Sequence, residues 1–324
     1  MRLSLACGDY DRTRPLIDGT VRPNGLELTC LPMPVEEIFF RMARFREFDA
    51  AELSLGSYLV SRPLSGPFVA IPVFPSRSFR HSGIYVPVDS PASSPSDLAG
   101  KTVGLAEYQL TANIWIRGIL AERHGLPVEA VRYRTGGLHA PGRPEKLAVS
   151  LPPTIDIAPI GAGETLSDLL AAGSIDALYT PRTPRAYVEG RARRLFPDFP
   201  AVEEQYFRDT GIFPIMHVVV LRADVYQRDR WIARSLLDAF VRARQITLDG
   251  MAETAALRYM LPWLVADVEH ARSVLGDNYW TYGLPGNEAA LSALVGYAHS
   301  QGLIDGVPAP ADLFAPETLA DTVI

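Results

Sequence analysis

Two of the six histidines, His81 and His217, are the candidates for acid–base chemistry. Each lies in a segment predicted to cross between two halves of the chain, and imidazole is the commonest general acid or base near neutral pH. A single histidine among apolar residues is more often a satisfied core residue. Two histidines at one hinge make a catalytic role as good an interpretation as a structural one.

Two acidic residues, Glu52 and Glu107, lie in or directly after predicted strands. The ordinary role of such a carboxylate is to bind a neighbouring arginine. Glu107 is kept as a third candidate catalytic residue, because it would complete the site from the other half of the chain when the two halves close.

Arginines are abundant in the same regions, and their forked guanidinium groups bind carboxylates through paired hydrogen bonds. We expect Arg12, Arg80 and Arg182 to bind an anionic small ligand. The alternative for these side chains is ion pairing with acidic neighbours on the surface. Thr111 opens a predicted helix whose free amides would attract a further negative group.

Other hydroxyl and amide side chains lie just after predicted strands, where they could contact the same ligand. They are Tyr10, Ser54, Ser57, Tyr58, Tyr108 and Gln109.

The elements that must position these side chains alternate between strand and helix. Apolar and polar residues alternate over 2–7 and 26–31, which predicts strands, and apolar residues recur every three or four positions over 35–47, which predicts a helix. Strands at 49–54 and 68–74 continue the alternation. This order is typical of a mostly parallel sheet flanked by helices.

The same pattern restarts near residue 84, with a strand at 102–105 and a helix at 111–124 that Thr111 can cap and Gly125 can end. Later predicted elements are a helix at 165–172, strands at 175–179 and 215–221, and helices at 231–248, 262–275 and 287–301.

We therefore expect two α/β lobes, each with a mixed, mostly parallel sheet flanked by helices, joined by two crossing strands that act as a hinge. Lobe 1 would be discontinuous, comprising residues 1–84 and 214–324 with the C-terminal helices, and lobe 2 would be an insertion of residues 85–213. Ligands in open α/β sheets bind beyond the carboxyl ends of the strands. The candidate residues should therefore line a cleft between the lobes.

The charge of the chain argues against several classes of partner. Its 324 residues carry 31 Lys and Arg against 37 Asp and Glu, a formal net charge of −6. That is the wrong sign for a protein that neutralises phosphates, so neither nucleic acid nor a membrane surface is an expected partner. The helical C-terminal third could form an interface between copies of the chain.

The sequence also limits location and cofactors. No apolar run approaches the roughly 20 residues of a membrane-spanning helix, and the apolar stretch at 3–7 is too short for a secretory signal. We expect a cytoplasmic protein whose two cysteines are thiols. Dinucleotide loops, Walker loops, nucleophile elbows and zinc-ligand spacings are missing from the sequence, so no cofactor and no metal are predicted.

Several short stretches are distinctive when taken together. They include Asp9-Tyr10-Asp11-Arg12-Thr13, Glu52-Leu53-Ser54, Phe79-Arg80-His81, Glu107-Tyr108-Gln109, Pro214-Ile215-Met216-His217 and Leu261-Pro262-Trp263. Together they resemble the 4,5-dihydroxyphthalate decarboxylases, over nearly the whole chain.

The resemblance implies a type 2 periplasmic-binding-protein-like fold that serves as an enzyme inside the cell. It further implies a cofactor-independent carboxy-lyase that converts 4,5-dihydroxyphthalate to protocatechuate and carbon dioxide in phthalate degradation, a branch of aromatic catabolism. Another hydroxylated aromatic acid is an alternative substrate, because a fold does not fix a function.

The chemistry of this reaction requires a base, an acid and an anion clamp. Direct loss of carbon dioxide from an aromatic acid leaves an in-plane carbanion that the ring π-system cannot stabilise, so the ring must be protonated first. Our hypothesis is that His81 and His217 divide the acid and base roles while Arg12, Arg80 and Arg182 hold carboxylates.

Two other functions fit the same sequence features. One is a solute-binding protein that binds an aromatic or other small carboxylate without chemistry. The other is a menaquinone-pathway enzyme of the same fold, which would need a larger cleft that accommodates a nucleoside.

Overall fold

The computed structural model describes residues 1–63 and 66–319, and the chain divides into two compact units. Unit 1 consists of Met1–Arg77, Ile215–Ser292 and Pro308–Ile324. Unit 2 consists of Ser78–Pro214 and Ala293–Val307.

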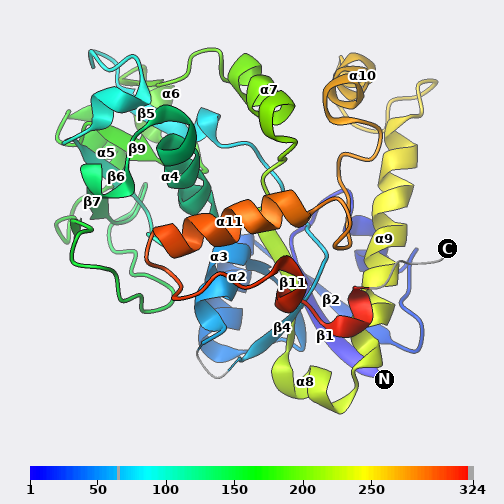
Figure 1. The fold of residues 1–324 in the computed structure, drawn as a ribbon. Helices are drawn as coiled ribbons and strands as arrows, with labels where there is room; N and C mark the ends of the chain where they lie inside the picture. Colours follow the sequence, from blue (N-terminus) through cyan, green and yellow to red (C-terminus); the bar gives the residue numbers. More distant parts are fainter. Residues whose placement is uncertain (64–65, 320–324) are drawn as a thin grey trace. The chain divides into compact units, whose positions relative to one another are not determined.

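Unit 1 is built on a five-stranded sheet with the strand order β2-β1-β3-β11-β4 (Figure 1). The strands are β1 (Arg2–Cys7), β2 (Glu27–Pro32), β3 (Ala50–Ser54), β4 (Phe68–Ile71) and β11 (His217–Arg222). β11 pairs antiparallel with both of its neighbours, whereas β1 pairs parallel with β2 and β3. The start of β11 therefore lies at the same edge as the carboxyl ends of the other strands.

The helices of unit 1 bury apolar stripes against this sheet. In α2, for example, Ile38, Phe39 and Met42 recur at helical spacing and all are buried. The helices are α1 (Arg14–Ile17), α2 (Val35–Phe45), α3 (Leu55–Ser61), α8 (Ala223–Arg228), α9 (Trp231–Met251) and α10 (Leu264–Leu275).

Unit 2 has a six-stranded sheet with the order β10-β5-β9-β6-β7-β8. Its strands are β5 (Ile84–Pro87), β6 (Thr102–Leu105), β7 (Arg132–Thr135), β8 (Ile157–Pro159), β9 (Ala177–Tyr179) and β10 (Ala192–Arg194). Here β5 is the strand that pairs antiparallel with both neighbours. In each unit one strand, β11 or β5, is thus antiparallel to the other strands of its sheet.

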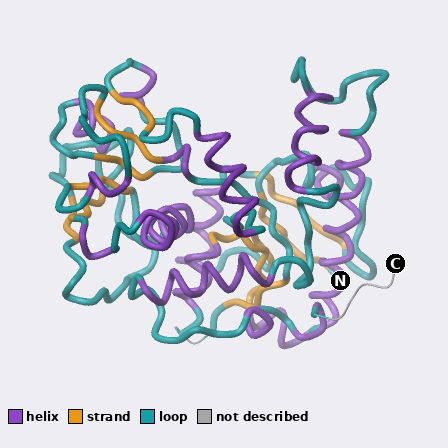
Figure 2. Tube along the Cα trace, turned by 45° about the horizontal axis from the view of Figure 1, so that its top comes forward, coloured by secondary structure: helices purple, strands orange, loops and turns teal. Residues whose placement is uncertain are grey.

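Helices pack around the strands of each unit, as Figure 2 shows with helices in purple and strands in orange. Those of unit 2 are α4 (Thr111–His124), α5 (Leu166–Ala171), α6 (Arg185–Val188) and α7 (Phe199–Thr210), and α11 (Glu288–Ser300) belongs partly to each unit. Short 3-10 helices are formed by His81–Gly83, Pro95–Leu98, Val128–Ala130, Pro310–Leu313 and Pro316–Thr318.

Two segments expected in lobe 1, residues 78–84 and 293–307, belong to unit 2. The first crossing falls between Arg77 and Ser78, and Ala293–Val307 is counted with unit 2. The reason lies in helix α4, whose buried Arg117 donates from Nε to Gln301 Oε1 at 2.8 Å and whose Trp115 packs edge-on against Tyr297. These contacts attach the last part of α11 to unit 2.

The α/β fold class predicted from the sequence is confirmed, but some elements were missed. β7 and β10 are short and rich in arginine, so they lack an apolar alternation, and α7 opens with a proline-containing stretch. The predicted cap of α4 is wrong, because the N-cap is Leu110 and Thr111 is already the first residue of the helix. Gly125 ends that helix as expected, with a left-handed φ of 62°.

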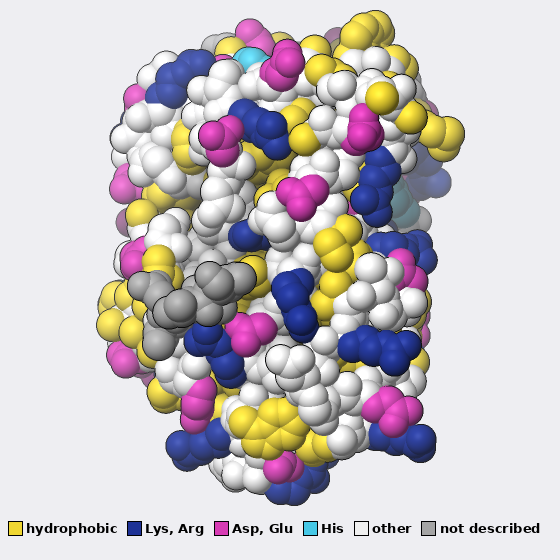
Figure 3. All heavy atoms as spheres, turned by 90° about the vertical axis from the view of Figure 1, so that its right-hand side faces the viewer, with side chains coloured by type: hydrophobic (Ala, Val, Ile, Leu, Met, Phe, Trp, Pro, Cys, Tyr) yellow, Lys and Arg dark blue, Asp and Glu magenta, His cyan; other side chains and the backbone are white. Residues whose placement is uncertain are grey.

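On the face shown in Figure 3, basic and acidic side chains are interspersed and form no single basic patch. Within the described residues, no helix is long and apolar enough to cross a membrane.

Gly118 in α4 tests the packing of α11 on unit 2. A Cβ at this position would lie 2.2 Å from the ring of Tyr297, whereas a Cβ at Gly296 in α11 meets nothing within 4 Å. We expect Gly118→Ala to lower the free energy of unfolding by about 1–3 kcal/mol despite the better helix propensity of alanine. The matched control, Gly296→Ala, should raise it by up to about 1 kcal/mol. Chemical denaturation measures both, and equal effects would contradict this packing.

Candidate active site

The carboxyl edge of the unit 1 sheet brings residues from three segments together. His217, the first residue of β11, pairs in register with Ser54, the last residue of β3. Gly8 directly follows β1, the parallel neighbour of β3. Polar side chains that are far apart in sequence therefore meet at this edge.

Glu52 is the centre of this group. It is completely buried within β3, and its Oε1 accepts hydrogen bonds from the Tyr10 hydroxyl at 3.0 Å and shares a 2.6 Å hydrogen bond with His217 Nδ1. Its Oε2 accepts the backbone amide of Gly8 at 2.9 Å. Both carboxylate oxygens are thus bound by groups of the same unit.

These contacts keep Glu52 ionised inside the protein. Burial raises the pKa of the Glu52 carboxyl, but the hydrogen bonds from His217, Gly8 and Tyr10 outweigh burial and lower the pKa below its ordinary value. The pKa of the Tyr10 hydroxyl is raised by burial and by Glu52, so this group stays a donor. Glu52 and His217 Nδ1 therefore hold each other in a fixed orientation.

The imidazole of His217 is held on one side only. Its Nδ1 is bound to Glu52, and the edge of the ring packs against Phe39 with centroids 4.8 Å apart. Nε2 has no hydrogen-bond partner among the residues that the structure describes, and 16% of the side chain is exposed. This nitrogen is available to a ligand.

Arg12 lies beside Tyr10 in the same unit. Its guanidinium carbon is 4.2 Å from the ring centroid of Tyr10 and 4.6 Å from that of Trp280. Its Nη1 is 2.9 Å from Asp11 Oδ1, and its Nε donates to the carbonyl of Pro75. The two aromatic faces fix the plane of a cation that can still bind a carboxylate with its remaining donors.

Three other predicted ligand contacts in unit 1 are Ser54, Ser57 and Tyr58. Ser54 is the N-cap of α3, and its Oγ accepts the amide of Ser57 at 3.5 Å. The hydroxyl of Ser57 is buried and has no hydrogen-bond partner among the described residues. Tyr58 is buried and donates to the carbonyl of Leu313 at 2.5 Å. Of these, only Ser54 lies at the edge where Glu52 and His217 meet.

In unit 2, Glu107 is tied to two basic residues. It is 1% exposed, and its Oε1 contacts Lys146 Nζ and lies 2.8 Å from Arg143 Nη2. Lys146 is itself 6% exposed. A carboxylate bound in this way neutralises the charge of nearby cations, which is a structural role.

The neighbours of Glu107 are also part of the packing of unit 2. Tyr108 is buried beneath the Arg117 guanidinium at 3.8 Å and donates to the carbonyl of Gln301 at 3.2 Å. Gln109 donates to Glu145 at 2.9 Å and to the carbonyl of Leu147 at 2.7 Å. Thr111, the first residue of α4, is buried as well.

His81 belongs to unit 2 and is 2% exposed. Its ring packs against Phe196 and Tyr206, with centroids 5.6 and 5.4 Å away, and Nδ1 is 3.9 Å from Glu203 Oε1. Burial, with a smaller contribution from His124, lowers the pKa of His81 to about 4. The imidazole is therefore neutral at pH 7.

The two remaining predicted arginines differ in burial. Arg80 is half-buried, and burial lowers its pKa to about 10 against the opposing effect of Glu203. Arg182 is exposed, and its backbone bonds with the Thr180 hydroxyl at 3.1 Å.

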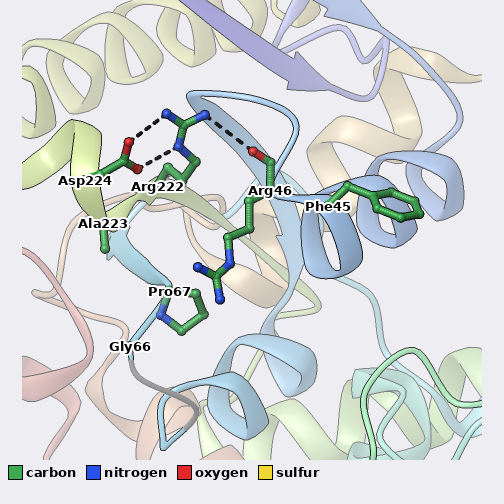
Figure 4. Close-up of a pocket in the computed structure, with 7 residues that line it drawn as sticks. All are labelled: Phe45, Arg46, Gly66, Pro67, Arg222, Ala223 and Asp224. Atoms are coloured by element: carbon green, nitrogen blue, oxygen red, sulfur yellow. Dashed lines mark hydrogen bonds and ion pairs between the residues drawn. The ribbon is translucent and has the colours of Figure 1, made fainter.

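Two cavities have linings that include neither Glu52 nor the residues that bind it, Tyr10, Gly8 and His217. His81, His124 and Tyr206 line one of about 370 Å³ in unit 2. The other, about 480 Å³, is at the opposite edge of the unit 1 sheet, where Arg222 at the end of β11 is bound by both oxygens of Asp224 at 2.6 and 2.7 Å (Figure 4). The charge of Arg222 is thus already neutralised.

The sequence interpretation missed several residues around Arg12. Trp280, Tyr282 and Arg244 all lie in unit 1, and Glu52 was assigned an ordinary structural role. The signal for Glu52 was its position two residues before the end of a strand that is otherwise apolar. Within the described residues, no three His, Cys, Asp or Glu side chains are grouped in a way that could hold a metal ion.

The low pKa of His81 makes a testable contribution to stability. Because the folded pKa of about 4 lies below the ordinary 6.5, the unfolded chain takes up this proton first as the pH falls. This contribution is fully present above about pH 6.5 and is lost as the pH falls towards 4, by up to about 3 kcal/mol. We expect the unfolding free energy of His81→Asn to fall less than that of wild type between pH 7 and pH 4. Parallel denaturation curves at both pH values would contradict the burial of this ring.

Comparison with known proteins identifies the family. No family model matches the chain. The chain is 37% identical over 322 residues to the 4,5-dihydroxyphthalate decarboxylase of Comamonas testosteroni, covering 98% of each protein. It is 43% identical over 194 residues to a protein of the same name from Pseudomonas putida, covering 60% of this chain and 75% of that one.

Solved structures show the fold. A periplasmic sulfonate-binding protein from Methylobacillus flagellatus matches 97% of this chain and 91% of its own, with a TM-score of 0.57 at 16% identity. A Candida albicans protein with the generic periplasmic-binding-protein fold matches 95% of this chain and 92% of its own, with a TM-score of 0.53 at 10% identity. The expected fold is thereby confirmed, and the full-length similarity to the Comamonas protein shows that the chain belongs to the 4,5-dihydroxyphthalate decarboxylase family.

Proposed function

We propose that this protein is a carboxy-lyase that converts 4,5-dihydroxyphthalate to protocatechuate and carbon dioxide. The observation that carries the proposal is the 37% identity to a decarboxylase of that name over 98% of both chains. The Glu52–His217 pair beside Arg12 supplies the types of group that such a reaction needs.

The reaction replaces a carboxylate on the ring by a proton. A base removes the proton of the hydroxyl para to the leaving carboxylate, and the electron pair moves through the ring to the carbon that carries this carboxylate. An acid protonates that carbon. The carbon–carbon bond then breaks, carbon dioxide leaves, and its bonding electrons restore the aromatic ring and the phenolate, which takes back its proton from the base.

His217 is the proposed acid. Glu52 holds Nδ1 and so orients the ring, which leaves Nε2 free to deliver a proton to the ring carbon. Glu52 is a positioning residue, because it acts through the imidazole. Water reprotonates His217 after each turnover, which balances the one proton that the product gains.

His81 is the proposed base that removes the proton of the hydroxyl. Its neutral imidazole at pH 7 suits a proton acceptor better than a proton donor. Arg12 is proposed to bind a carboxylate of the substrate, and Arg80 and Arg182 remain candidates for the same task. Glu107 is a weaker proposal for catalysis, because Lys146 and Arg143 already bind it.

The partner of the protein is a small molecule. We propose that it acts in the cytoplasm, without a nucleic acid partner and without an organic cofactor. Its assembly into oligomers is open to measurement by light scattering.

The function is tested by incubating purified, chelator-treated protein with 4,5-dihydroxyphthalate and measuring carbon dioxide and protocatechuate. We expect both products from wild type, and His217→Ala to lower kcat by about 10²–10⁴-fold. Glu52→Gln should lower kcat with a smaller effect on KM. His270→Ala, an exposed histidine of α10, is the matched control and should leave turnover unchanged.

Two outcomes would contradict the proposal. Tight binding without either product would place the protein among solute-binding proteins. Wild-type turnover by His217→Ala would remove His217 from the mechanism. Restored activity on adding a divalent metal would show that the chelator had removed a required ion.

A further inference from the structure

Arg244, on helix α9, is a buried cation without a carboxylate partner. It is 8% exposed, and Nη1 donates to the backbone carbonyl of Trp280 at 3.0 Å. Its Nε is buried without a hydrogen-bond partner, and Arg244 forms no ion pair with any residue that the structure describes. Leaving a guanidinium in this state is costly, which indicates that an anion completes the site.

Tyr282 provides a second unsatisfied group at the same place. It is 8% exposed, and its ring centroid is 5.4 Å from the Arg244 guanidinium. Its hydroxyl has no hydrogen-bond partner in the part of the chain that the structure describes. Burial raises the pKa of this hydroxyl even though Arg12, Arg244 and Arg77 lie close enough to oppose it. The phenol therefore stays protonated and can donate a hydrogen bond to an anion.

Trp280 connects these groups to the Glu52 cluster. Its carbonyl accepts from Arg244, its ring lies 4.6 Å from the Arg12 guanidinium, and its Nε1 donates to the carbonyl of Phe74 at 3.1 Å. Arg12 in turn lies over the ring of Tyr10, which donates to Glu52. The unsatisfied donors and the proposed acid thus belong to one continuous group of side chains in unit 1.

The charges in this group do not balance. Glu52 is bound by His217 and Tyr10, and Asp11 is 2.9 Å from Arg12, which leaves the guanidinium of Arg244 uncompensated. A carboxylate on the ligand would supply the missing negative charge.

Decarboxylation determines which carboxylate belongs here. The leaving carboxylate loses its charge as carbon dioxide forms, so an ion pair with it would stabilise the substrate more than the transition state. The carboxylate that stays on the ring keeps its charge throughout. A strong ion pair with the retained carboxylate therefore binds the substrate without opposing the reaction.

We propose that Arg244 and the Tyr282 hydroxyl, together with Arg12, form the binding site for the carboxylate that an aromatic dicarboxylate retains. This inference rests on the proposed function, because it assigns the two carboxylates of the substrate to different places. The leaving carboxylate then lies towards Glu52 and His217, where no guanidinium is needed.

The test compares dissociation constants by calorimetry for 4,5-dihydroxyphthalate, protocatechuate and catechol, all measured in a His217→Ala background that slows consumption of the first ligand. Protocatechuate keeps only the retained carboxylate, and catechol has neither. The variants are Arg244→Met and Tyr282→Phe. Arg242→Met is the matched control, because Arg242 is exposed two residues away on the same helix.

We expect Arg244→Met to weaken the binding of 4,5-dihydroxyphthalate and of protocatechuate by the same factor, at least about tenfold, since it removes charge-assisted hydrogen bonds. Tyr282→Phe should weaken the binding of the same two ligands by about threefold or more. The dissociation constant of catechol should be the same with and without each substitution. Tyr282→Phe keeps the test valid if Arg244→Met does not fold.

Three results would overturn the inference. Unchanged protocatechuate binding in Arg244→Met and Tyr282→Phe would show that the retained carboxylate lies elsewhere. Weaker binding of 4,5-dihydroxyphthalate alone would place the leaving carboxylate at Arg244 and Tyr282. Equally weaker binding of catechol would mean that both residues only support the structure. If wild type binds protocatechuate through Arg244 but releases no carbon dioxide, the proposed function fails and the carboxylate site stands.

Discussion

The hydrogen bond between Glu52 and His217 is the interaction on which the rest of this site depends. A carboxylate that is completely buried in the middle of a sheet is stable only if its charge is bound, and here Tyr10, Gly8 and His217 bind it. The antiparallel direction of β11 makes this contact possible, because it brings the first residue of that strand to the end of β3. The same edge then receives Arg12 from the loop after β1.

A decarboxylase must treat the two carboxylates of its substrate differently. One must become neutral, whereas the other can anchor the ring with its full charge. Unit 1 has candidate groups for both tasks, because it contains a buried carboxylate–imidazole pair, and its buried Arg244 and Tyr282 have donors without partners among the described residues. A protein that only binds a solute needs the anchoring task alone.

The fold class followed from the sequence because alternating apolar patterns mark buried strands directly. His217 and Arg12 were found from the same pattern, since His217 lies in a predicted crossing strand and Arg12 follows the first predicted strand. Arg244, Trp280 and Tyr282 could not be found in this way, because a helix and an irregular segment bring them to the site through tertiary packing. Glu52 was undervalued, because the sequence does not show that its partners are a histidine 165 positions away and a tyrosine.

Ring protonation before loss of carbon dioxide is tested most directly with 4-hydroxyphthalate in deuterium oxide. This compound has a hydroxyl para to only one of its carboxylates. If His217 protonates the ring carbon para to the ionised hydroxyl, the product is 3-hydroxybenzoate with one deuterium at the carbon that lost its carboxylate. Nuclear magnetic resonance identifies the isomer and the labelled position. Formation of 4-hydroxybenzoate would contradict the account, because the carboxylate lost would then have no para hydroxyl to drive protonation of its carbon.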